Sequence, residues 1–177
     1  EQDIEKTIVT IRNISPAFGA INLEDIKAPE CFEIEEKLQD IDIPVMHDDQ
    51  HCTAIAVLAA LINSLKIVNK EIENINIVIN GAGAAGIAIT KLLFKYNVRN
   101  IIILDSKGII YDGRGGLNRY KQEIAGTTNT KKLKGTLKDA IKMADVFIGV
   151  SVKDALLPKF VKTMNKQLFN QKTALNL

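Results

Sequence analysis

The first helix of the chain is indicated by isoleucines at a spacing of three to four residues. These are Ile4, Ile8, Ile11 and Ile14, and the pattern stops before Pro16, which disfavours helix in the residue that precedes it. A second helix is expected to follow Pro29 with three buried positions, Cys31, Ile34 and Leu38. Between and after these helices we expect two short apolar strands, at residues 18–23 and 44–46.

The rest of the chain alternates strand patterns with helix patterns. Continuous β-branched runs predict buried strands at residues 75–79, 100–105 and 146–150. Helices are expected at residues 53–65, around Ile87, Leu92 and Leu93, and at residues 137–141; the first of these is apolar nearly all round and is expected to be buried on most sides. This alternation predicts an α/β fold with a Rossmann-like, doubly wound parallel sheet.

Composition limits the size and class of the protein. The 177 residues, 46% of them hydrophobic, can form one domain or one and a half. The 23 Lys and Arg nearly balance the 21 Asp and Glu, so no nucleic-acid partner is expected. We also expect no membrane span and no secretory leader, and with only two cysteines we expect a cytoplasmic, reduced protein.

A glycine-rich turn follows the strand expected at residues 75–79. Gly81, Gly83 and Gly86 have the GxGxxG spacing of a dinucleotide-binding turn between a strand and a helix. In that motif the first glycine makes the tight turn, the second lets the pyrophosphate approach, and the third lets helix and strand pack closely. A glycine turn with a purely structural role is the alternative.

Asp105 stands at the end of the next expected strand. It lies 105 − 86 = 19 residues after the last glycine, close to the spacing of about 20 for a carboxylate that binds the adenine ribose. A carboxylate there repels the 2′-phosphate of NADP and favours NAD. Lys107, two residues later, could neutralise that phosphate and keeps NADP open.

Acidic pairs follow both short apolar runs of the N-terminal part. Glu24 and Asp25 follow the first run, and Asp48 and Asp49 follow the second. Both pairs are expected on one edge of a sheet, where their mutual repulsion would be relieved by Mg²⁺ or Mn²⁺. The alternative is that these residues cap the helices that follow.

The segment that contains Asp48 also carries residues of two other chemistries. His47 and His51 have the spacing of a zinc-binding H-E-x-x-H helix, but Asp48 stands where that motif needs Glu, and the chain has no third histidine. Cys52 could be a nucleophile at a helix N-terminus, although a small packed residue is the simpler interpretation. We therefore favour neither zinc hydrolysis nor cysteine catalysis.

Six segments spread over nearly the whole chain resemble the malic enzymes, in particular the shorter bacterial type. They are FGAINLEDI at residues 18–26, CFEIE at 31–35, DIPVMHDDQH at 42–51, NGAGAAG at 80–86, DSKG at 105–108 and ADVFIGVS at 144–151. The resemblance implies NAD(P)-dependent oxidative decarboxylation of malate to pyruvate and CO₂, with a divalent cation. It also implies a homodimer or larger homo-oligomer for the complete enzyme.

Several residues match positions with known roles in that family. The resemblance places the metal ligands at Glu24, Asp25 and Asp49, and gives Asp48 a supporting role beside the catalytic base. It places cofactor contacts at Thr53, Gly81, Ala82, Gly83, Ala84, Ala85, Gly86, Asp105, Ser106 and Ser151. No segment matches the family's catalytic tyrosine and lysine, and Cys52 stands where the family usually has glycine.

Together, these observations predict two parts. Residues 1–50 are expected to be a remnant of the substrate and metal side, and residues 51–177 an NAD(P)-binding Rossmann domain that is incomplete at its C-terminus; residues 173–177 resemble the start of a further strand. The chain alone is then expected to be inactive. The alternatives are a catalytically inactive dinucleotide-binding module or degenerate paralogue, and some other Rossmann dehydrogenase whose acidic pairs would be scattered.

Overall fold

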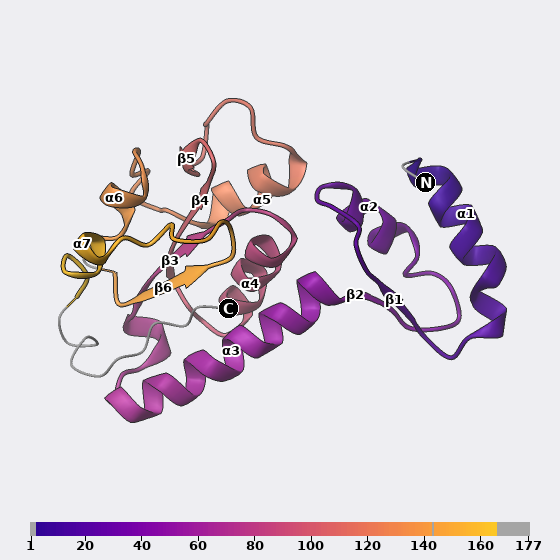
Figure 1. Ribbon diagram of the computed structural model, residues 1–177, viewed down its shortest axis with the longest axis horizontal. Helices are drawn as coiled ribbons and strands as arrows, with labels where there is room; N and C mark the ends of the chain where they lie inside the picture. The colour runs from indigo at the N-terminus through magenta and orange to yellow at the C-terminus, as the bar shows by residue number, and fades with distance from the viewer. Residues whose placement is uncertain (1–2, 143, 166–177) are drawn as a thin grey trace.

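The structure is a computed structural model that describes residues 3–142 and 144–165. It shows a small N-terminal unit and a larger α/β unit, connected by one long helix, α3 (Asp48–Val68) (Figure 1). The segment expected to begin a further strand, residues 173–177, lies outside the described residues.

The N-terminal unit is built on a pair of short parallel strands. β1 (Ile21–Leu23) pairs in register with β2 (Val45–His47), so that Leu23 lies opposite His47. Two helices, α1 (Ile4–Ile14) and α2 (Glu30–Lys37), pack with them, and a short 3-10 turn, η1 (Ser15–Ala17), follows α1. Their common core contains Ile8, Leu23, Ile34 and Leu38. The expected helices are confirmed, whereas the strand expected at residues 18–23 begins only at Ile21.

The α/β unit is built on a four-stranded sheet with the order β5-β4-β3-β6. The central strand β3 (Asn76–Asn80) pairs in parallel with β4 (Asn100–Asp105) and with β6 (Val146–Gly149), as expected for a Rossmann-like sheet. The turn η2 (Ile72–Asn74) leads into β3, α4 (Ala84–Lys95) follows it, and three further helices are α5 (Arg119–Thr127), α6 (Leu137–Ala140) and α7 (Pro158–Val161). The side chains of Ile77, Ile79, Ile101 and Ile103 are almost completely buried, which explains why the middle of each strand is apolar.

One strand and two helices of the α/β unit, β5, α5 and α7, were not expected. β5 (Gly108–Ile109) turns back antiparallel to β4, and α5 follows a glycine-rich loop. The start of α5 has a recognisable signal, because the Asn118 side chain caps it by accepting a hydrogen bond from the Lys121 N–H.

Helix α3 differs most from its expectation. It begins at Asp48 rather than Thr53 and runs across the boundary expected at residue 50. Its inner face, with Val57, Leu61 and Leu65, is buried and packs against α4, but Ile55 and Ile67 are 61% and 72% exposed. The expectation that α3 is buried on most sides is therefore wrong.

Helix α3 is the part of the chain that bears on the expectation of no membrane span. By length and composition α3 would be able to cross a membrane, contrary to that expectation. A helix that packs its apolar side into a protein core passes the same test. One face of α3 packs against α4, and 28% of its most apolar stretch is buried.

Candidate dinucleotide and metal site

The glycine turn connects β3 to α4, and each of its three glycines has a different surrounding. A Cβ atom at Gly81, where φ is +126°, would overlap the carbonyl oxygen of Val150, and one at Gly86 would overlap the carbonyl oxygen of Gly81. A Cβ at Gly83 would meet nothing within 4 Å. Packing therefore requires the first and third glycines, whereas the second borders open space in which a ligand can approach the backbone.

A cavity of about 340 Å³ lies beside this turn. It is lined by Gly81, Ala82 and Gly83, and also by Asp105, Ser106 and Ser151 from the ends of the neighbouring strands. The structure thus brings together six of the ten residues expected to contact a cofactor. Ala84, Ala85 and Gly86 lie in the first turn of α4, and Thr53 lies on α3; none of these four lines the cavity.

The Asp105 carboxylate is held by two positively charged side chains, Arg114 and Lys121, which were not predicted from the sequence. Its Oδ2 accepts hydrogen bonds from Arg114 Nη2 at 2.5 Å and from Lys121 Nζ at 2.9 Å, and its Oδ1 accepts one from the Lys107 N–H at 2.9 Å. Burial raises the pKa of this carboxyl, but the hydrogen bonds from Arg114 and Lys121 outweigh burial and lower it from 3.8 to about 2. Asp105 is therefore ionised at neutral pH, at the edge of the cavity.

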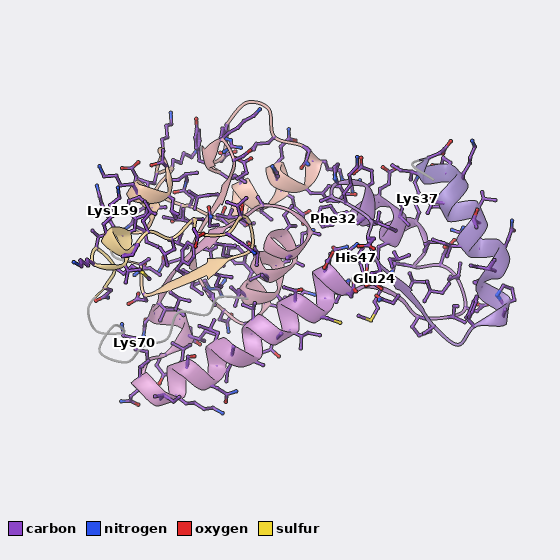
Figure 2. All side chains as sticks on the ribbon, in the orientation of Figure 1. Glu24, Phe32, Lys37, His47, Lys70 and Lys159 are labelled. Carbon is purple, nitrogen blue, oxygen red and sulfur yellow. The ribbon has the colours of Figure 1, made fainter. Side chains whose placement is uncertain are left out.

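The two acidic pairs follow neighbouring strand ends, as expected. Since Leu23 pairs with His47, Glu24 and Asp25 leave β1 beside the point where Asp48 and Asp49 begin α3. Figure 2 shows Glu24 and His47 at this junction of the two units. Asp25 has a φ of +56°, a left-handed conformation that costs energy in most residues and is concentrated at functional sites.

The ligand atoms of these residues are only partly gathered. Among the described residues, His47, Asp48 and Asp49 place one possible ligand atom each within 4.8 Å of one another. Glu24 and Asp25 do not belong to that group, so the chain approaches the expected ligand set without assembling it fully.

The chemistry of the donor set suits a hard divalent cation. The hydrogen bonds from the Asp49 N–H and from Asn22 lower the pKa of Asp48, which keeps this carboxyl ionised at neutral pH. Several carboxylates at one junction provide the oxygen ligands that Mg²⁺ and Mn²⁺ prefer. The residues present therefore fit such an ion.

The two histidines face different partners. His47 is completely buried and its Nε2 lies 3.1 Å from the Ile26 carbonyl oxygen, whereas His51 is exposed and its Nε2 lies 2.5 Å from Glu35 Oε1. His51 is not part of the group formed by His47, Asp48 and Asp49. The geometry gives no support to a zinc site of the H-E-x-x-H kind.

Cys52 is an exposed residue of α3, so the expectation that it is a small packed residue is wrong.

Helix α2 lies between the acidic junction, which is formed by Glu24, Asp25, Asp48 and Asp49, and the cavity beside the glycine turn, which is called the dinucleotide cavity below. Phe32 packs on Tyr120 of α5 with 4.5 Å between the ring centroids, and Arg119 of the same helix lies 3.4 Å from Glu36. Phe32 and Ala28, a few residues after Asp25, also line the cavity. In Figure 2, Phe32 stands between the two units. The metal side and the cofactor side are therefore adjacent.

A parallel sheet with this glycine turn and a carboxylate at the end of the next strand defines a dinucleotide-binding protein of the Rossmann type. Residues 50–171 match the sequence model of the family described as "Malic enzyme, NAD binding domain", and residues 1–39 match "Malic enzyme, N-terminal domain". The chain belongs to the malic enzyme family.

Curated relatives and solved structures agree with this assignment. The chain is 54% identical over 166 residues to a bifunctional malic/malolactic enzyme of Bacillus subtilis, covering 93% of this chain and 40% of that protein. It is 48% identical over 168 residues to an NADP-dependent malic enzyme of Haemophilus influenzae, covering 93% of this chain and 22% of that protein. The crystal structure of an NAD-dependent malic enzyme from Thermotoga maritima superposes with a TM-score of 0.89 at 46% identity, covering 93% and 44% of the two chains. The chain thus spans less than half the length of these relatives.

Proposed function

We propose that this chain is the NAD(P)- and divalent-metal-binding part of an enzyme that converts (S)-malate to pyruvate and CO₂. The observation that carries the proposal is the cavity that joins Gly83 to Asp105, with Phe32 on the side of the acidic junction. The names of its relatives, NAD- and NADP-dependent malic enzymes, support malate as the substrate of the complete enzyme.

Different residues of the chain would bind the dinucleotide and the divalent cation. The amide groups around Gly83 and the start of α4 would hold the pyrophosphate, and Asp105 would accept hydrogen bonds from the ribose. Glu24, Asp25 and Asp49 would hold the divalent cation. Hydride acceptance and stabilisation of negative charge on the substrate oxygen are the chemistry that the dinucleotide and the cation supply when bound.

Asp48 would act beside the reacting groups and not on the substrate itself. Its carboxyl stays ionised because its lowered pKa lies far below neutrality. A fixed negative charge here would orient a cationic catalytic base. No residue of the chain matches the lysine and tyrosine of the family, and positioned acids and bases contribute about 10²–10⁴-fold to such reactions. We therefore propose that the chain alone has negligible malate-decarboxylating activity.

NAD is the proposed cofactor in preference to NADP. Asp105 is fixed in its ionised form, and this charge opposes a 2′-phosphate. Arg114 and Lys121 already pair with this carboxylate, so that their charges are engaged before any cofactor binds.

We further propose that the protein is cytoplasmic and that the complete enzyme is a homodimer or larger homo-oligomer. Both cysteines are free thiols, which fits a reducing compartment. The exposed apolar side of α3, with Ile55 and Ile67, is the kind of surface that protein contacts bury.

The test is a titration of NADH fluorescence with the unsubstituted chain and with Gly83→Ala. A Cβ at position 83 meets nothing within 4 Å, and the backbone there has φ −91°, so the fold should tolerate alanine. We expect unchanged thermal unfolding and at least tenfold weaker NADH binding, because the methyl group occupies the approach to the pyrophosphate. Equal binding by both proteins would refute the assignment of the cavity.

A degenerate, non-catalytic dinucleotide module is the second candidate. The incomplete metal site favours it, since Glu24 and Asp25 do not belong to the group in which ligand atoms of His47, Asp48 and Asp49 lie within 4.8 Å of one another. Adding the missing part of a bacterial malic enzyme as a separate chain distinguishes the two. Restored malate turnover supports the enzyme, and NADH binding without restored turnover supports the module.

A further inference from the structure

The imidazole of His47 connects the two acidic pairs of the metal side. His47 is the last residue of β2, directly before Asp48, and its side chain is completely buried. Its Nε2 lies 3.1 Å from the carbonyl oxygen of Ile26, the residue that follows Glu24 and Asp25. Because a carbonyl oxygen can only accept, Nε2 must carry the proton and donate this hydrogen bond.

The segment that receives this bond needs to be held in place. The pairing of β1 with β2 ends at Leu23 and His47, so Glu24 and Asp25 lie beyond the strand ladder. Asp25 adopts a left-handed backbone conformation with φ +56°, which persists only where the surroundings fix it. The bond from His47 to Ile26 supplies a fixed point immediately after Asp25.

The other side of the same ring faces the second acidic pair. His47 Nδ1 is buried, has no hydrogen-bond partner among the described residues, and lies 3.8 Å from Asp48 Oδ1. It belongs to the group in which His47, Asp48 and Asp49 approach within 4.8 Å. One side of the ring therefore bonds to the segment that follows Glu24 and Asp25, and the other side lies near Asp48.

We propose that His47 is a positioning residue for the divalent cation: its Nε2–H···O=C bond to Ile26 keeps Glu24 and Asp25 in place opposite Asp49. This inference rests on the metal site of the proposed function. In this proposal the ligands are Glu24, Asp25 and Asp49, and His47 acts through its hydrogen bond to Ile26, while its buried Nδ1 lies 3.8 Å from Asp48 Oδ1. Loss of such an orienting contact typically weakens metal binding 10–100-fold.

Two substitutions separate the two sides of the ring. His47→Gln places an amide N–H near the position of Nε2 and can still reach the Ile26 carbonyl. His47→Asn places its amide near the position of Nδ1 and is too short to reach Ile26. His51→Gln is the matched control, because it removes the second imidazole of the chain from the first turns of α3, where it contacts Glu35 instead.

The measurement is Mn²⁺ affinity, obtained by titrating each protein and following the electron paramagnetic resonance signal of free Mn²⁺. Thermal unfolding without metal is recorded in parallel to check the fold. We expect His47→Asn to weaken Mn²⁺ binding at least tenfold, and His47→Gln and His51→Gln to stay within about threefold of the unsubstituted chain. Rescue by glutamine is the result that a purely space-filling role of the ring would not give.

Each other outcome is informative. No Mn²⁺ binding by the unsubstituted chain overturns the proposed metal site and this inference with it. If that chain binds Mn²⁺, equal affinity in both His47 variants overturns the inference alone, and so does equal weakening, which would assign the effect to the volume of the ring. Weaker Mn²⁺ binding in His47→Gln than in His47→Asn overturns the inference, because it would show that the contact of Nδ1, and not that of Nε2, supports the metal site. Should His47→Asn fail to fold, weakened Mn²⁺ binding by His47→Gln relative to His51→Gln still contradicts the proposal.

Discussion

Replacing Asp105 by asparagine removes one charge from the edge of the dinucleotide cavity and keeps the side-chain shape. The Asp105 side chain is 10% exposed, and its two cationic partners, Arg114 and Lys121, are 11% and 22% exposed. A fall of its pKa from 3.8 to about 2 corresponds to roughly 2 kcal/mol of stability at neutral pH. Asp105→Asn is therefore expected to lower the free energy of unfolding by about 2 kcal/mol at pH 7.

The difference in free energy of unfolding between the unsubstituted protein and Asp105→Asn should depend on pH. The pKa of Asp105 is lower in the folded protein, so its contribution is fully present above the ordinary pKa of 3.8 and is lost as the pH falls towards 2. Urea unfolding of both proteins should show a difference that is constant from pH 7 to about pH 5 and shrinks below about pH 4. A difference that does not change between pH 7 and pH 3 would contradict the ion-pair explanation.

The substitution should also change cofactor preference. A unit charge about 4 Å from a phosphate contributes up to about 4 kcal/mol at an effective dielectric constant of 20. Removing that repulsion, and freeing Arg114 and Lys121 to meet a 2′-phosphate, should raise the affinity for NADPH relative to NADH at least tenfold. Asp112→Asn is the control, since that carboxylate is 62% exposed and pairs with Lys132 away from the cavity lining. An unchanged NADPH to NADH ratio in Asp105→Asn refutes the placement of the ribose.

Two further predictions concern stability and thiol chemistry. Asp145→Asn should cost about 2–4 kcal/mol in urea unfolding at pH 7, because the buried carboxylate accepts hydrogen bonds from Lys70 at 2.7 Å and from the Asn76 N–H at 2.8 Å. Burial raises the pKa of Asp145, but the hydrogen bonds from Lys70 and Asn76 lower it overall, so the stability difference between the two proteins should shrink below about pH 4. A loss of less than about 0.5 kcal/mol at pH 7 would contradict the role of these hydrogen bonds. Burial raises the pKa of the Cys31 thiol to about 11, whereas Cys52 is exposed, so a disulfide reagent at pH 8 should modify Cys52 quickly and Cys31 only after denaturation. Peptide mass spectrometry checks this, and equal rates at the two thiols would argue against the burial of Cys31.

The buried strands could be predicted closely from the sequence because burial on both faces leaves short runs that are mainly apolar. β4 coincides with residues 100–105, and β3 and β6 differ from expectation by one residue at their ends. Helix α3 was placed too late because its first turn contains Asp48 and Asp49, which stabilise a helix N-terminus through charge and carry no apolar signal.

The ion cluster around Asp105 could not be predicted because it depends on tertiary structure. Arg114 lies beyond β5, a strand of two residues, and Lys121 lies in α5; the turn between them determines whether either reaches Asp105. The glycine turn was predictable, because the motif spacing already encodes the tight turn at Gly81 and the close approach of Gly86 to the Gly81 carbonyl, although the contact of Gly81 with Val150 comes from tertiary structure. The contact between His47 and Ile26 joins two segments 21 residues apart, and no spacing rule indicates it.

A crystal structure of the protein grown with NAD⁺ and Mn²⁺ tests the central claim most directly. We predict the pyrophosphate against Gly83, the adenine ribose on Asp105, and Mn²⁺ held by Glu24, Asp25 and Asp49. A dinucleotide bound outside the cavity lined by Gly83 and Asp105, or Mn²⁺ bound to carboxylates other than these three, would contradict the account.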